Sequence, residues 1–247
     1  MNSAYHLRVP LRVELGNATS IELSAVPASL LVPLGSTEQH GPHLPLDTDT
    51  RIATAVARGA GARLGHDWLV APAIAYGASG EHQDFAGTIS IGTEALTLLL
   101  MEYGRSAACW AARLVFVNGH GGNADALTRA VSRLRAEGRD VGWCPCTAVG
   151  GSSPADAHAG HTETSVLLHL SPDDVSTERW LAGNRAPLRE LLPAMRRGGV
   201  AAVSPVGVLG DPTTATAGEG ERIFDEMVDK CVNRVARWSP GPDGMLT

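Results

Sequence analysis

Short apolar segments alternate along the chain with longer segments of helical periodicity. The apolar segments are nearly continuous, which is typical of strands covered on both faces of a parallel sheet. The alternation of strands with helices favours an α/β fold with a largely parallel sheet. The expected strands are 29–35, 68–77, 113–123 (running into a glycine loop) and 139–146, and the expected helices are 50–65, 93–111, 123–138, 162–170 and 219–237.

Local signals mark some ends of these elements. Thr93 and Thr162 are expected as helix N-caps, and Gly138 is expected to end the helix before it. Residues 239–247 have the composition of a frayed tail. Segment 150–161 is loop-like but too short to separate two domains, and no internal repeat occurs. We therefore expect a single domain over residues 1–247.

Composition and charge exclude several classes of protein. Hydrophobic residues make up 44% of the chain and charged residues 19%, which is ordinary for a globular protein. The net charge of −6 provides no basic surface for nucleic acid, and no apolar run approaches the length of a membrane span. Residues 1–16 lack the apolar core of a signal peptide, and the cysteines follow no zinc or CxxC spacing. We therefore expect a cytoplasmic protein with buried free thiols.

The segment GSTEQHGPHLPLDTDT at 35–50 concentrates side chains of the kinds that bind metals. Its glycines and prolines interrupt regular structure, so we expect the polar groups to lie on a loop. Such a loop is either a solvated turn or a site, and the rest of the sequence must distinguish the two. The carboxylates and imidazoles in this segment are Glu38, His40, His43, Asp47 and Asp49.

Two further polar clusters flank expected strands, one in NGHGGN at 118–123 and one in HAGHTETS at 158–165. Sites in parallel sheets lie at the carboxyl ends of the strands, so we expect the clusters to converge there. Carboxylates and imidazoles bind Zn²⁺, Mn²⁺ or Fe²⁺, and a carboxylate such as Asp49 can bridge two ions through its two oxygens. The groups expected at this edge are Glu38, His40, Asp49, His120, His158, His161 and Glu163.

Together these three segments resemble the signature segments of the creatininase (creatinine amidohydrolase) family. The resemblance covers roughly residues 29–170 and implies a three-layer α/β/α sandwich with a mostly parallel sheet. It implies a centre of two divalent ions (Zn, Fe or Mn) that cleaves C–N amide bonds, in a homo-oligomer of hexamer size or larger. By position it implies metal ligands at Glu38, His40, Asp49 and His120, with Asp49 as the bridge, an acid/base at His158 and a substrate-pocket residue at Ser79.

The chain departs from creatininase itself at two places. Gly122 stands where creatininase has a glutamate ligand, so Glu163 is expected to supply the missing carboxylate. Segment 150–161 lacks the tryptophan of the segment that closes over creatinine. The chain resembles instead the branch associated with mycofactocin, a redox cofactor made from a ribosomal peptide. In that branch a peptidase removes a C-terminal Val-Tyr dipeptide from the modified precursor peptide, which is therefore the implied substrate.

Other functions stay open on the sequence alone. A creatininase-like hydrolase of a small cyclic amide uses the same ligands. A serine hydrolase needs a GxSxG elbow, whereas Ser79 lies in GASG. An α/β binding module without catalysis is the third alternative, but neither GxGxxG nor a Walker A motif follows an expected strand. Participation in the site is likewise open for His43, Asp47, His82 and His161.

Overall fold

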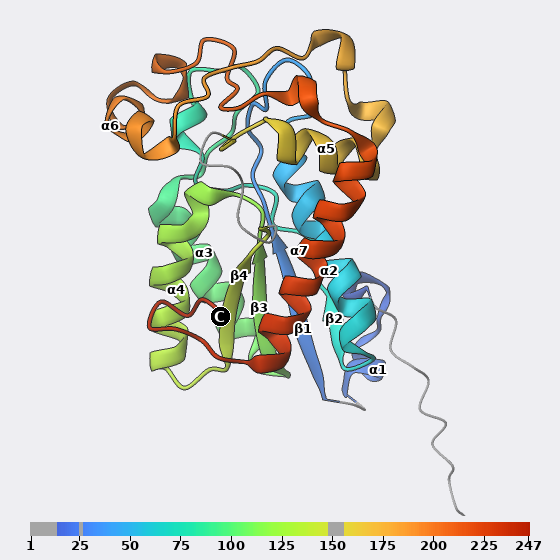
Figure 1. The fold of residues 1–247 in the computed structure, drawn as a ribbon. Coiled ribbons are helices and arrows are strands. Elements are labelled where there is room, and N and C mark those ends of the chain that lie inside the picture. The colour runs from blue at the N-terminus through green and yellow to red at the C-terminus, as the bar shows by residue number, and fades with distance from the viewer. Residues whose placement is uncertain (1–13, 25–26, 148–155) are drawn as a thin grey trace, which may run out of the picture.

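A four-stranded, all-parallel sheet forms the centre of the computed structural model, which describes residues 14–24, 27–147 and 156–247 (Figure 1). Every residue of the first strand is buried, so both faces of the sheet are covered. The strands are β1 (Ala28–Leu34), β2 (Trp68–Val70), β3 (Ala111–Asn118) and β4 (Val141–Pro145), in the order β2-β1-β3-β4.

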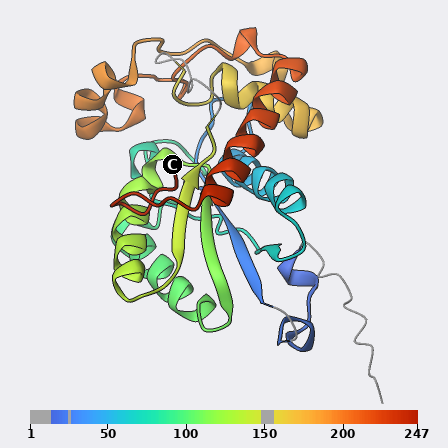
Figure 2. The same cartoon turned by 60° about the horizontal axis from the view of Figure 1, so that its bottom comes forward.

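Helices cover the sheet on both sides (Figures 1 and 2). On one side, Leu30, Val32 and Leu34 of β1 join a core with α3 and α4. Leu31 points the opposite way, into a core with α2 and α7, as the two-residue period of a strand requires. The expected three-layer α/β/α sandwich is confirmed. The helices are α1 (Ser20–Ser24), α2 (Thr48–Leu64), α3 (Gly92–Ala107), α4 (Ala124–Ala136), α5 (His161–Leu170), α6 (Leu188–Gly198) and α7 (Ala217–Arg237).

The second strand is shorter than the expected 68–77. β2 ends at Val70, and beyond it only an isolated bridge joins Leu34 to Ile74. Pro72 has no N–H to donate to a ladder, which is a physical reason for the chain to leave the sheet here. The residues that follow are free to run across the carboxyl end of β1, toward the polar clusters.

The expected N-caps Thr93 and Thr162 are wrong. α3 begins at Gly92, and α5 begins at His161, so both threonines lie inside the first turn. The side chain of Asp156 caps α5 instead, because its Oδ2 accepts hydrogen bonds from the Thr162 backbone N–H (2.9 Å) and hydroxyl (2.5 Å). Among the described helices, none combines the length and apolar composition that a membrane span needs.

The segment 239–247 is not a frayed tail. Leu246 is fully buried, its N–H donates to the Trp143 carbonyl (2.8 Å), and the Trp143 N–H donates to the Gly244 carbonyl (3.1 Å). The expectation failed because β4 is an edge strand whose outer backbone groups can pair with this segment, and Met245 and Leu246 pack it onto the core. The segment therefore covers an edge that would otherwise be open to pairing with other chains.

All the cysteines are free, as expected, but they are not all buried. Cys144 and Cys231 are buried, with their Sγ atoms 3.6 Å apart. Cys146 is half-buried, and Cys109 is exposed just after the end of α3, so the expectation of burial is wrong for Cys109.

Candidate metal centre

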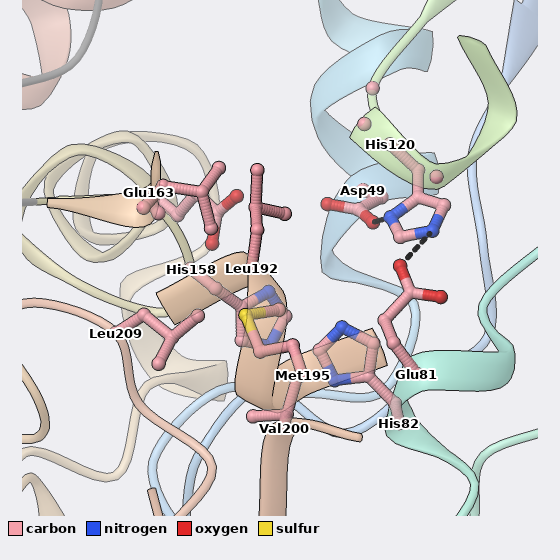
Figure 3. Close-up of a pocket in the computed structure, with 15 residues that line it drawn as sticks. Asp49, Glu81, His82, His120, His158, Glu163, Leu192, Met195, Val200 and Leu209 are labelled. Atoms are coloured by element: carbon pink, nitrogen blue, oxygen red, sulfur yellow. Dashed lines mark ion pairs between the residues drawn. The ribbon is translucent and has the colours of Figure 1, made fainter. Parts of the chain in front are cut away.

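The polar clusters meet where β1 and β3 end (Figure 3). β1 leads into the segment with Glu38 and His40, and β3 leads through Gly119 to His120. Asp49 was expected on a loop but lies in the first turn of α2. A Cβ at Gly119 would lie 2.3 Å from the Asp49 carbonyl oxygen, so only glycine lets this turn approach the strand so closely.

Glu38 lies at the centre of the cluster and is completely buried. Neither carboxylate oxygen has a hydrogen-bond partner within the described residues. Imidazole nitrogens nevertheless surround it: His120 Nδ1 is 3.2 Å away, His82 Nε2 3.3 Å and His158 Nδ1 3.7 Å. Burial is the main cause that raises the pKa of Glu38 to about 8. A buried carboxylate without donors needs a compensating cation.

Asp49 connects the two sides of the cluster through its two oxygens. Its Oδ1 lies 3.2 Å from His40 Nε2, and its Oδ2 lies 3.1 Å from His120 Nδ1. The Ser36 hydroxyl donates a hydrogen bond to Oδ2 (2.8 Å) and fixes the carboxylate. Burial alone would raise the pKa of Asp49, but the neighbouring His40 and His120 hold it well below its usual value.

The ligand-type atoms form three groups, each with its atoms within 4.8 Å of one another. Glu163 joins through its Oε2, which lies 3.9 Å from His40 Nε2 and accepts a hydrogen bond from the Ala159 N–H (2.7 Å). Buried nitrogen and carboxylate donors at this spacing fit divalent ions. The groups are Glu38–Asp49–His120, His40–Asp49–Glu163 and Glu38–His40–His158.

Metal binding should release protons. Burial alone would lower the pKa of His40, yet Asp49 outweighs burial and raises the pKa to about 10. For His120 the carboxylates of Glu38 and Asp49 likewise outweigh burial and raise the pKa to about 9. At pH 7.5 both imidazoles of the metal-free protein, and most of the Glu38 carboxyl groups, hold a proton that a ligand cannot keep, so we expect release of roughly two to three protons per chain.

Calorimetric titration of the metal-free protein with Zn²⁺, in two buffers of different ionisation enthalpy, measures this release. The apparent metal affinity should also rise with pH up to about 9–10, because protons compete less as the pH approaches the two pKa values. Buffer-independent heats would show that the imidazoles are already neutral before the metal binds.

His158 stays neutral, unlike His40 and His120, whose pKa values are raised. Burial, followed by the charges of His40 and His82, holds its pKa well below the usual value. Its Nε2–H donates to the Gln39 carbonyl (2.8 Å), so Nδ1 carries the free lone pair and faces Glu38. Two backbone hydrogen bonds hold the main chain of His158 in place, since its N–H and C=O both bond to backbone groups of Leu209.

A cavity of about 330 Å³ opens onto the cluster. Its lining includes two residues that sequence reasoning missed or left open, Glu81 and His82, on the 3₁₀ turn Gly80–His82. They follow no strand, and their only sequence signal is the acidic and imidazole pair in GEH. The polar residues on the lining are Asp49, Glu81, His82, His120, His158 and Glu163, and the others are Gly119, Gly121, Gly122, Ala157, Leu188, Leu192, Met195, Val200 and Leu209.

Several candidate residues lie away from the cavity. Ser79 does not line it: the side chain is fully buried and Oγ has no hydrogen-bond partner in the described chain. His43 bonds to the Thr164 hydroxyl through Nε2 (2.9 Å). Asp47 accepts from Arg51 Nε (2.7 Å), and His161 Nδ1 lies 2.8 Å from the Thr214 hydroxyl. Of the residues left open, only His82 therefore faces the cluster.

Gly122 makes room for Glu81. A Cβ at position 122 would lie 2.4 Å from His120 Nε2 and 2.8 Å from Glu81 Oε1. Glu81 Oε1 itself lies 3.6 Å from His120 Nε2, and Figure 3 shows the two side chains facing each other. The site therefore has a carboxylate from a different segment in the space that a side chain at 122 would enter.

Gly122→Ala should displace the His120 ring. The added methyl group would overlap His120 Nε2 and the Ala78 carbonyl, each 2.4 Å from the Cβ position. We expect metal affinity to fall by about 10–100-fold, the range typical of lost ligand support. Gly121→Ala is the matched control, because a Cβ there meets no atom within 4 Å. Equal metal affinities in the two variants, measured by chelator competition, would contradict the steric argument.

Comparison with known proteins identifies relatives of this chain. The family model described as creatinine amidohydrolase (Creatininase) matches residues 17–235. A protein of Mycobacterium tuberculosis (strain CDC 1551 / Oshkosh) named mycofactocin precursor peptide peptidase is 75% identical over 255 residues, covering 100% of both chains. The creatinine amidohydrolase of Pseudomonas putida is 29% identical over 239 residues, covering 85% of this chain and 90% of that protein.

Solved structures agree with the sequence relatives. The structure described as "Creatininase Mn" superposes with a TM-score of 0.76 at 26% identity, covering 93% of this chain and 99% of that chain. Its agreement extends over the whole sandwich, and the family model reaches from before β1 almost to the end of α7. The chain belongs to the creatininase family of metal-dependent amidohydrolases.

Proposed function

We propose that this hydrolase uses two divalent ions to cleave a C–N amide bond of a peptide. The observation that carries the proposal is Asp49, whose two oxygens belong to two different ligand groups. One ion would be held by Glu38, Asp49 and His120, and the other by His40, Asp49 and Glu163. Two ions at such a centre polarise an amide carbonyl and make water more acidic.

His158 is the group proposed to move the proton. Its Nδ1 faces the cluster as a free acceptor, and the Gln39 carbonyl holds the other proton on Nε2. Nδ1 accepts a proton from the attacking water, whose oxygen bonds to the carbonyl carbon. The same proton then passes to the leaving nitrogen as the C–N bond breaks.

The proposed substrate is the modified mycofactocin precursor peptide, with release of its C-terminal Val-Tyr dipeptide. The 75% identity to a protein named for this precursor supports the choice. The test incubates metal-loaded enzyme with the modified peptide and measures product masses. Chelator-treated enzyme is the control, and added metal should restore cleavage. A parallel incubation uses creatinine as the substrate. If the peptide stays intact and the creatinine ring is opened, the cyclic-amide alternative is favoured. If the peptide and creatinine both stay intact, a binding module is favoured.

Glu163, rather than Glu81, is proposed to supply the metal-ligand carboxylate that Gly122 lacks, because it forms a ligand group with His40 and Asp49. Glu163→Gln should empty the position shared with His40 and keep the ion held with Glu38, so metal content falls from about two ions per chain to about one. Glu178→Gln, an exposed carboxylate outside the cavity, is the control. Two ions and full activity in Glu163→Gln would place the missing ligand elsewhere.

The sequence also predicts a cytoplasmic location, and the family resemblance predicts a homo-oligomer of hexamer size or larger, with Zn, Fe or Mn at the two positions. These are proposals for this chain. Light scattering on the eluting peak of a sizing column measures the subunit number. Elemental analysis of protein purified without added metal identifies the ions.

A further inference from the structure

α6 is an amphipathic helix at the end of the sheet where the strands finish (Figures 1 and 2). Its apolar side chains recur at helical spacing and form one stripe, whereas its arginines lie on the other faces. An apolar stripe on a surface helix normally packs on a core. The stripe consists of Leu188, Leu191, Leu192 and Met195.

Only part of this apolar stripe packs against the rest of the protein. Leu191 is buried in a small cluster with Val200 and Leu209, and Met195 packs against its edge. That cluster is separate from the two cores that flank the sheet. Leu188 and Leu192 stay 38% and 36% exposed. Folding therefore leaves two leucines of the stripe more than a third exposed to solvent.

Those two leucines face the cavity of the metal centre. Leu188, Leu192 and Met195 line the same cavity as Asp49 and Glu163. Figure 3 shows Leu209 at the left, Leu192 in the middle and Met195 and Val200 below it, with His120 and Glu81 on the right. The lining thus combines the ligand-type side chains with an apolar wall, most of which comes from α6.

We propose that this apolar wall, Leu188, Leu192 and Met195 with Val200 and Leu209, is the specificity subsite for a large apolar side chain next to the scissile amide. The inference rests on the proposed amide hydrolysis at the metal centre. Neither lysine nor arginine appears on the described lining of the cavity, so selection here works through shape and apolar burial rather than charge. A substrate side chain would bury the exposed leucines, which is favourable in proportion to the apolar area removed from water.

The test separates metal binding from wall binding. Acetohydroxamic acid chelates the ions but has no group to reach the wall, whereas 4-methylpentanohydroxamic acid adds a branched alkyl chain. We expect metal-loaded wild-type protein to bind the longer compound at least about tenfold more tightly, because each buried methylene adds severalfold to affinity. In L188A/L192A this advantage should largely disappear, with the acetohydroxamate affinity unchanged.

Two controls guard against indirect effects. L98A/L99A removes two leucines of α3 that are 59% and 38% exposed and do not line the cavity, and it should keep the full advantage. Leu192→Met should keep most of it, since methionine restores apolar area. An undiminished advantage in L188A/L192A would overturn the subsite while the metal function stands. Failure of both hydroxamates to bind metal-loaded wild type would overturn the metal function, and the subsite with it.

Discussion

Asp49→Asn is expected to lose both metal ions and essentially all activity while the fold is retained. The carboxylate oxygens lie 3.2 Å from His40 Nε2 and 3.1 Å from His120 Nδ1, so each faces a different ligand group. An amide at this position presents only one oxygen and no charge. Loss of supporting residues around metal sites typically costs about 10–100-fold in metal affinity, and a shared ligand should cost more than that at each position.

Elemental analysis and circular dichroism on the same preparation check this expectation. Asp47→Asn is the matched control, because Asp47 lies two residues earlier and pairs with Arg51 on the surface. The control should keep its ions and its turnover. Normal metal content in Asp49→Asn would rule out the bridging role.

His158→Ala is expected to keep both ions and to lower kcat by about 10²–10⁴-fold, the usual contribution of a positioned acid or base. The ring is neutral, and its Nδ1 is free because Nε2–H is committed to the Gln39 carbonyl. Neither of the two groups proposed to hold ions contains it. Proton transfer should therefore suffer while metal affinity does not.

Metal content and kcat must be measured on one preparation, because His158 also belongs to a third ligand group, with Glu38 and His40. His66→Ala, at an exposed imidazole between α2 and β2, is the control for loss of a histidine. Retained ions with near-normal kcat would exclude the proton-transfer role. Lost ions would instead make His158 a ligand.

The sheet and its covering helices could be predicted because their patterns are local. β1 is a continuous apolar run, and its burial on both faces follows from that composition. α6 was missed because Pro193 lies inside it, and proline inside a helical pattern argues for a break. The tail at 239–247 was misjudged because only Met245 and Leu246 in it are apolar residues that pack on a core, and nothing local shows that β4 is an edge.

The ligand candidates could be predicted because each follows a strand or precedes a helix at one edge of the sheet. Glu81 and His82 could not, because they reach the cavity only after the chain leaves the sheet near Pro72 and turns at Gly80–His82. Asp49 was predicted as a ligand, but its helix was expected to start later. The difference matters, since a side chain in a helical turn has fewer orientations than one on a loop.

The separate cluster under α6 has a consequence for motion. Leu191, Val200 and Leu209 form a hydrophobic cluster of their own, separate from the cores on the two faces of the sheet. Regions with few buried contacts open locally at a lower free energy than the whole domain unfolds. Amide hydrogens of α6 should therefore exchange with solvent by a local opening that leaves β1 and β3 protected. The same opening would admit an extended peptide to the proposed metal ligands without disturbing the sheet that positions them.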